Sequence, residues 1–273
     1  MDAPLPLLPD DVEPTRATLH AYLRAVAAVP RAHGIVHPRW WHIACLLRPD
    51  GLTTAPVPLP DGRSLSIRVD PRAGRIVIEA SDAPGPVLSM TEGLTASELG
   101  DRIIDAAAAY GLEGPYDRAS FADDGGGEYD PGHAAALFAA FTAADQLFTA
   151  HRAQLRGEVG PIQVWPHGFD IAFEWFGTRT VEHIAGGETA VSQAQLNLGF
   201  YPSGRPYFYS SPWPFEADVL LPIELPHGAS WHTDGWLGSV LYYDEVAGVP
   251  DGRERVLAYA RAVFAAAAPT LTA

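Results

Sequence analysis

Apolar residues recur every three or four positions in four stretches of the chain, which is the spacing of one face of a helix. These stretches lie at residues 11–30, 95–111, 130–156 and 251–264. Capping residues mark two of the starts, because Thr95 and Asp251 are each followed three positions later by a glutamate. The pattern predicts four principal helices, of which the first ends at Pro30 and the second at Gly111.

Apolar and polar residues alternate in other stretches, as they do along strands with one buried face and one wet face. At residues 64–70 three apolar side chains alternate with polar ones, and residues 75–80 repeat the pattern after a turn. Residues 40–47 are apolar on both faces, which predicts a central strand. Further alternation runs through residues 161–214. We therefore expect an α+β fold, with a mainly antiparallel sheet and about four principal helices.

The order helix, meander, helix occurs twice, once on each side of a loop of low regularity. This order predicts an N-terminal α+β half at residues 1–115, a linker loop at 116–131 and a C-terminal α+β half at 132–273, packed as one compact unit. Two explanations stay open, a true duplication and independent use of a common arrangement. Residues 1–10 are rich in proline and are expected to lie over the surface.

The charge of the chain limits its partners. The 273 residues include 33 acidic and 18 basic side chains, and the net charge of −15 argues against nucleic acid and anionic membranes as partners. The alternative is that the charge serves solubility alone. The N-terminus lacks the features of a secretory signal, and no stretch approaches the ~20 apolar residues of a membrane span. We therefore expect a cytoplasmic protein without a membrane partner, of undetermined oligomeric state.

All 18 basic residues are arginine, and Cys45 is the only cysteine. Without lysine no Schiff base can form, so pyridoxal-phosphate chemistry and lysine-type aldolases are excluded. A single cysteine excludes disulfides within the chain and cysteine-ligated metal clusters. Because Cys45 lies in an apolar stretch, we expect a buried, inert thiol. No cofactor is expected.

The stretch 161–214 holds the main candidates for chemistry, because two of its expected strands carry polar side chains on one face. These side chains are Asp170, Glu174, Gln195 and Asn197. If the two strands are neighbours in register, the four side chains share a face that either meets water or forms the wall of a ligand cleft. The candidates for an aromatic lining of that cleft are Trp165, Tyr207 and Tyr209.

A second group of candidates lies near residue 40. Trp40 and Trp41 are expected on opposite sides of their strand, so that one is in the core and the other lines a cavity or a dimer contact. We take Trp41 and the adjacent His42 as ligand-binding candidates. His33 and His37 have the i, i+4 spacing of helical metal ligands, but a glycine and a proline argue against a helix there. No metal site is expected.

Five motifs, four of them with aromatic residues, occur in this order before the last helix: HPRWWHIACLL, GLTTAPVPLPDG, VWPHGFDIAFEWFGTR, GFYPSGRPYFYSSPWP and LGSVLYYDEV. Over nearly the whole chain they resemble those of a bacterial family known as domain of unknown function 5996. The resemblance implies a single homologous unit and supplies no activity. The matching positions include Trp41, His42, Gly51, Thr53, Asp170, Gly177, Arg179, Gly199, Phe200, Pro202, Tyr209 and Pro212. Where the family has a Ser-His-Glu run, this chain has Ser192-Gln193-Ala194, so no acid–base role is carried over.

Two classes of function follow. The first is a small-molecule enzyme without a redox cofactor, whose cleft lies on the polar face of the C-terminal sheet. Its candidates are His167 as base, Asp170 and Glu174 in acid–base or orienting roles, Asn197 as hydrogen-bond donor and Arg179 as anion clamp. The second is a non-catalytic ligand-binding or protein-interaction module with an aromatic-lined cavity. An enzyme should have Asp170 or Glu174 inside a concave pocket with a perturbed pKa. A binding module should have an apolar cavity or a flat aromatic patch, with these carboxylates in water.

Overall fold

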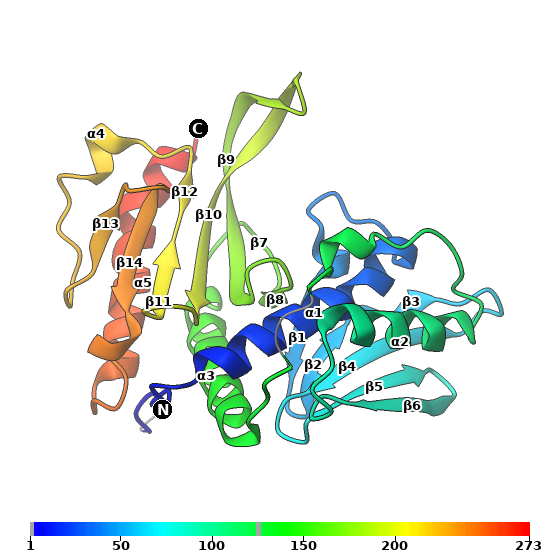
Figure 1. Ribbon diagram of the computed structural model, residues 1–273. Coiled ribbons are helices and arrows are strands. Elements are labelled where there is room, and N and C mark those ends of the chain that lie inside the picture. The colour runs from blue at the N-terminus through cyan, green and yellow to red at the C-terminus, as the bar shows by residue number, and fades with distance from the viewer. Residues whose placement is uncertain (1–2, 124–126) are drawn as a thin grey trace. The chain divides into compact units, whose positions relative to one another are not determined.

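The computed structural model describes residues 3–123 and 127–273 (Figure 1). The chain forms two compact units, each assembled from separate segments. Unit 1 contains the residues up to Leu7, Ala143–Ile162 and Ile171–Ala273, and unit 2 contains Leu8–Thr142 and Gln163–Asp170. Of the expected linker at 116–131, residues 124–126 lie outside the described part of the chain, and the rest of it belongs to unit 2.

Unit 2 has an antiparallel sheet with the strand order β8-β1-β2-β4-β5-β6, and β3 pairs with β4. The strands are β1 (Cys45–Arg48), β2 (Gly51–Thr54), β3 (Val57–Pro58), β4 (Ser64–Asp70), β5 (Arg75–Ala80), β6 (Ala83–Ser89) and β8 (Gln163–Trp165). The meander predicted from the alternation is confirmed, because β4 and β5 pair from Leu65 with Ala80 to Asp70 with Arg75. Cys45 is buried, as its apolar neighbours predict.

Two helices, α1 (Glu13–His33) and α2 (Ala96–Ala108), cover one face of this sheet (Figure 1). The predicted capping box begins α2. Thr95 Oγ1 accepts a hydrogen bond from the Glu98 amide at 3.1 Å, and Glu98 Oε2 accepts one from the Thr95 amide at 2.9 Å. The short 3₁₀ helices η1 (Trp41–Ile43) and η2 (Arg118–Ser120) complete unit 2 with the start of α3 (Pro131–Arg152), which belongs to this unit through Thr142.

Unit 1 has an antiparallel sheet with the order β13-β14-β11-β10-β9, in which β12 pairs with β10 and β7 with β9. The strands are β7 (Glu158–Val159), β9 (Asp170–Ala185), β10 (Glu188–Tyr201), β11 (Tyr207–Ser210), β12 (Pro212–Trp213), β13 (Ser230–His232) and β14 (Gly238–Tyr242). The helices are the end of α3, α4 (Ala217–Leu220), η3 (Tyr243–Glu245), α5 (Gly252–Ala267) and η4 (Ala268–Leu271).

One face of the unit 1 sheet packs on α3 and α5. The ring of Phe148 in α3 lies 6.0 Å from Phe173 and 6.2 Å from Phe208, centroid to centroid. From α5, the buried Tyr259 hydroxyl is 2.9 Å from the Ser239 hydroxyl of β14. The apolar face of β9 and β10 expected from the sequence therefore forms the core of this unit.

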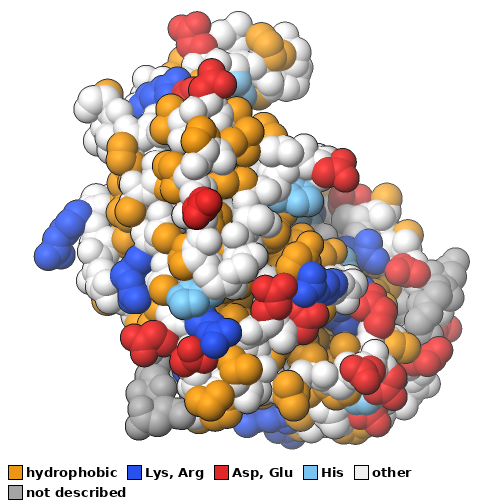
Figure 2. Space-filling model, turned by 90° about the vertical axis from the view of Figure 1, so that its left-hand side faces the viewer, with side chains coloured by type: hydrophobic (Ala, Val, Ile, Leu, Met, Phe, Trp, Pro, Cys, Tyr) orange, Lys and Arg blue, Asp and Glu red, His pale blue; other side chains and the backbone are white. Residues whose placement is uncertain are grey.

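The hairpin of β9 and β10 continues beyond the other strands of unit 1 (Figure 1), and it is the uppermost feature in the turned view of Figure 2. The ladder extends to the pair of Ala185 with Glu188. Gly186 and Gly187 close it with φ values of 60° and 87°, a left-handed conformation that glycine adopts readily in two-residue turns.

The structure confirms the fold class. Within residues 3–123 and 127–273, four helices exceed ten residues, namely α1, α2, α3 and α5, and the paired strands are antiparallel. None of the helices in this part of the chain has the length and apolar character needed to cross a membrane. The surface placement expected for residues 1–10 is wrong at Leu5, which is 1% exposed and forms a bridge to Ala247.

Two expected element boundaries and one expected helix cap are also wrong. The strand expected at 40–47 begins only at Cys45, because Trp40 has a φ of 60° and η1 follows it. Helix α1 does not stop at Pro30 but continues to His33, since a proline in the last turn removes one hydrogen bond without ending the helix. Asp251 precedes α5 but makes no side-chain cap; its carboxylate accepts from Arg255 instead.

Candidate functional site

A groove in unit 2 lies where α1 ends. The Gly34 amide donates to the Pro30 carbonyl oxygen at 2.9 Å, and a Cβ at Gly34 would collide with that oxygen. Only glycine therefore lets the chain leave the helix this closely. The chain then turns through the segment 35–40 into η1, opposite the link between β2 and β3.

Backbone hydrogen bonds fix the two histidines of this turn. His37 Nδ1 accepts from the Arg39 amide at 3.1 Å, and His42 Nδ1 accepts from the His37 amide at 3.2 Å. An imidazole nitrogen that accepts carries no proton, so each neutral ring holds its proton on Nε2. The two rings can therefore act as hydrogen-bond donors at Nε2, and their acceptor nitrogens are already in use.

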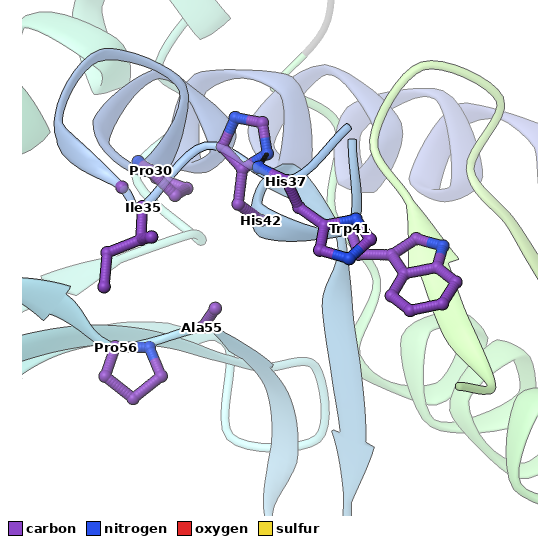
Figure 3. A pocket seen from close by; sticks show the side chains of 8 residues that line it. Pro30, Ile35, His37, Trp41, His42, Ala55 and Pro56 are labelled. Atoms are coloured by element: carbon purple, nitrogen blue, oxygen red, sulfur yellow. Dashed lines mark hydrogen bonds between the residues drawn. The ribbon is translucent and has the colours of Figure 1, made fainter. Parts of the chain in front are cut away.

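The groove is open to one side and has a volume of about 290 Å³ (Figure 3). It is lined by Pro30, Gly34, Ile35, His37, Trp41, His42, Ala55 and Pro56. In Figure 3 the side chains of Pro30 and Ile35 face those of Ala55 and Pro56, with the histidines at one end. The His37 ring stacks on Trp41 with 4.3 Å between centroids and 10° between planes. Ile35 is 76% exposed at the rim.

Two arginines, Arg31 and Arg39, lie near the histidine end of the groove. Burial lowers the pKa of His42 below its ordinary value, and the charges of His37 and Arg31 lower it further. His42 is therefore neutral near pH 7, and it lies beside the Arg31 cation. The guanidinium of Arg39 lies 5.6 Å from the Trp41 ring centroid, a cation–π distance.

The side chains that line the groove are mostly apolar. Among the described residues that line it there is no carboxylate, hydroxyl or thiol, so the two imidazoles are the titratable side chains of the lining. In the described part of the chain, no three histidine, cysteine, aspartate or glutamate side chains come together in a way that could hold a metal ion.

In unit 1 the structure brings most of the expected polar-face residues together. Glu174 of β9 lies directly opposite Asn197 of β10, and Gln195 lies opposite Phe176. Asn197 Oδ1 accepts from the Ser211 amide at 2.6 Å. Because Ala172 and Phe176 on the same face are buried, this face is neither fully wet nor uniformly polar.

The tyrosines expected to line this face come from β11. Tyr209 covers Gly199, where any Cβ would collide with the tyrosine ring. Tyr207 stacks on Trp236 with 6.2 Å between centroids, and Tyr209 meets the same indole edge-on at 6.3 Å. Trp236 comes from the turn after β13 and was not among the expected residues, because no periodicity marks that turn.

The other expected residues have different surroundings. Arg179 Nη1 donates to Glu216 at 2.6 Å and to the Thr270 carbonyl oxygen at 3.0 Å, so its guanidinium is engaged within unit 1. In unit 2, Asp170 is buried, whereas His167 is exposed in the turn before it. Trp165 is buried, and its ring lies 5.7 Å from that of His167.

Several groove residues carried no signal that sequence reasoning could use. Trp41 and His42 were expected to bind ligand and do line the groove, although the strand expected to carry them does not form there. His37 was considered only as a metal ligand. Ala55 and Pro56 line the groove because the folded sheet brings them there. The one local sign of an unusual segment was a proline within an extended stretch.

Comparison with known proteins gives a family and no activity. No curated protein matches the chain, and no solved structure does either. A model described as a family of unknown function, DUF5996, matches residues 5–272, nearly the whole chain, and the protein belongs to that family.

Proposed function

We propose that the protein binds a small molecule in the unit 2 groove, and that the ligand combines an apolar body with a hydrogen-bond-accepting or anionic group. The observation that carries the proposal is the groove of about 290 Å³, whose side-chain lining is apolar except for two imidazoles and the indole N–H of Trp41. In both imidazoles Nδ1 already accepts a hydrogen bond from a backbone amide. In its neutral form each ring can therefore offer a ligand only a donor, the Nε2–H group.

The size of the cavity limits the ligand. A cavity of ~150 Å³ holds a molecule the size of benzene, so this groove has room for about twelve non-hydrogen atoms. The apolar walls from Pro30, Ile35 and Pro56 suit a ring or a branched chain. Arg31 and Arg39 near the histidine end favour a carboxylate over an ammonium group.

The test compares benzoate with benzylamine, which has a similar ring and the opposite charge. Benzoate should raise the melting temperature more at equal concentration, because a ligand that binds only the native state stabilises it. Ala55→Phe should fill the groove and abolish the shift. Ala119→Phe, at an exposed position of unit 2, is the matched control and should keep it. Equal shifts with the two ligands, or a shift that survives Ala55→Phe, would refute the proposal.

The composition of the chain supports a cytoplasmic location for this protein. The single cysteine requires no oxidising compartment, and the net charge of −15 disfavours nucleic acid. We therefore propose that this small-molecule-binding protein is cytoplasmic.

A second candidate is an enzyme on the mixed face of unit 1, and one observation favours it. Glu174 is half-buried directly opposite Asn197, so a carboxylate and an amide lie side by side on a face that tyrosines flank. Such a pair can position a substrate and transfer a proton. Hydrolysis of a panel of chromogenic esters and glycosides should then be lost in Glu174→Gln and kept in Glu182→Gln, on the exposed hairpin. Equal rates in both variants would exclude this candidate.

A further inference from the structure

An apolar patch lies on the outer side of α4 and β13 in unit 1. Its members are Phe215, Val219, Leu221, Ile223 and Trp231. Figure 2 faces this side of the unit, and apolar side chains crowd the surface there with few charges between them. The rings of Phe215 and Trp231 meet edge-on at 5.9 Å, and Trp231 Nε1 donates to the Ile223 carbonyl oxygen at 2.8 Å. These contacts hold the two ends of the segment together.

The single turn of α4 forces the patch outward. Leu220 is 0% exposed and anchors the turn, whose amides bond to Glu216 and Ala217. With Leu220 inward, the neighbours on either side point to solvent. Val219 is 51% exposed and Leu221 47% exposed. Adjacent exposed apolar side chains of this kind mark interaction surfaces more often than isolated ones do.

The chain segment that carries the patch has acidic side chains and no arginine or lysine of its own. Residues 206–252 contain no arginine or lysine. Of their acidic residues, Glu216 pairs with Arg179, Asp244 and Glu245 pair with Arg205, and Asp251 pairs with Arg255. In the described structure no ion pair involves Asp218 or Glu224, which flank the patch, or Asp234 in the turn between β13 and β14.

We propose that the apolar patch docks a basic amphipathic segment of another protein, with its apolar residues on Val219 and Leu221 and its lysines or arginines against Asp218 and Glu224. A second copy of this chain fits poorly, because a symmetric contact would set these acids against one another. An anionic membrane fits poorly for the same electrostatic reason. The patch belongs to unit 1 and the groove to unit 2, and the inference does not depend on the proposed function.

The test uses the full chain and a short labelled helical peptide of leucine and lysine, with leucine on one face. Fluorescence anisotropy should show binding that weakens as NaCl rises, and a peptide with glutamate in place of lysine should not bind. The double variant Val219→Ser, Leu221→Ser should lower the affinity about tenfold, since it removes about 1.4 kcal/mol of apolar burial. Asp218→Asn with Glu224→Gln should weaken binding several-fold and flatten its salt dependence.

Matched controls keep the inference falsifiable. Val87→Ser alters an apolar side chain that is 57% exposed in unit 2 and should leave the peptide affinity unchanged. Asp105→Asn removes an exposed carboxylate from α2 and should also leave the peptide affinity unchanged. The proposal fails if the controls weaken binding as much as the patch variants, or if the glutamate peptide binds equally well. It also fails if ultracentrifugation shows a dimer that the patch variant dissociates, because a second copy would then be the occupant.

Discussion

His151 is a histidine held neutral inside unit 1. It is 5% exposed, and its ring lies 6.4 Å from Phe173 and 6.1 Å from Phe264. Burial, and then the charge of Arg261, lower its pKa from 6.5 to about 4. Protonation is thus easier in the unfolded chain than in the folded one, so the unfolded state binds more protons between these pH values. The stability that this histidine contributes is complete above pH 6.5 and is lost as the pH falls through about 4.

We predict that His151→Leu removes this pH dependence. Between pH 7.5 and pH 4.5 the wild-type protein should lose about 2–3 kcal/mol more stability than the variant, since each pKa unit is worth about 1.4 kcal/mol. At pH 7.5 the variant should be at least as stable, because His151 Nδ1 is buried without a hydrogen-bond partner in the described structure. Urea unfolding at both pH values measures the difference. His167→Leu, at an exposed position, is the control, and an equal response from it would contradict the assignment.

The sequence predicted the burial of single side chains better than it predicted the backbone conformation that forms the groove. Cys45 is buried as expected, and burial raises the pKa of its thiol to about 12. The conformation of residues 37–42 was not predictable, because it depends on side chain-to-backbone hydrogen bonds such as that from the His37 amide to His42. An apolar run has the same sequence pattern whether it forms a strand or a turn that exposes an indole. Residues around position 40 form such a turn, in which Trp40 is 55% exposed.

At the scale of elements, the start of α2 offers a direct test. Both bonds of its capping box are present, so Thr95→Ala should destabilise the protein by about 1 kcal/mol. The same sequence pattern before α5 gives no cap, because the Asp251 carboxylate accepts from Arg255 at 3.0 Å on the surface. Asp251→Ala should therefore leave the stability almost unchanged, because an exposed ion pair contributes little. Urea unfolding of the two variants measures both effects, and equal losses would mean that the cap adds nothing at Thr95.

These two helix starts show what local sequence can specify. A threonine or an aspartate three positions before a glutamate predicts a helix start correctly in both places. Whether the side chain caps the helix depends on the approach of the preceding chain. Thr95 has the extended conformation that a cap requires, with ψ of 161°, whereas Asp251 has ψ of 12°. The loop before each helix sets that angle, and no periodicity encodes it.

At the scale of the molecule, the strand and helix content was predictable and the grouping of segments was not. Alternation at residues 64–80 is a local signal that gave the meander of unit 2. The contact of Leu5 with Ala247 joins opposite ends of the chain, and the Gly248 amide donates to Leu5 at 3.0 Å. No spacing rule reaches that far, because local patterns report which face is apolar and not what covers it.

The charge balance, 18 basic against 33 acidic residues, leads to a prediction for the whole molecule. Fifteen uncompensated negative charges repel one another in the folded state, and the unfolded chain spreads them apart. Salt also weakens surface ion pairs such as that of Arg205 with Asp244, but exposed pairs contribute only about 0–1 kcal/mol each. The repulsion should therefore dominate.

Adding NaCl should raise the melting temperature at pH 7.5. Most of the rise should come below about 0.15 M, where the screening length falls to about 8 Å and distant charges stop interacting. A change of a few degrees is expected, since about 1 kcal/mol shifts the midpoint of a protein of this size by ~2–4 °C. Potassium chloride should act alike, because screening depends on ionic strength and not on the cation. A melting temperature that falls steadily with salt would show instead that the arginine ion pairs outweigh the repulsion among the remaining acids.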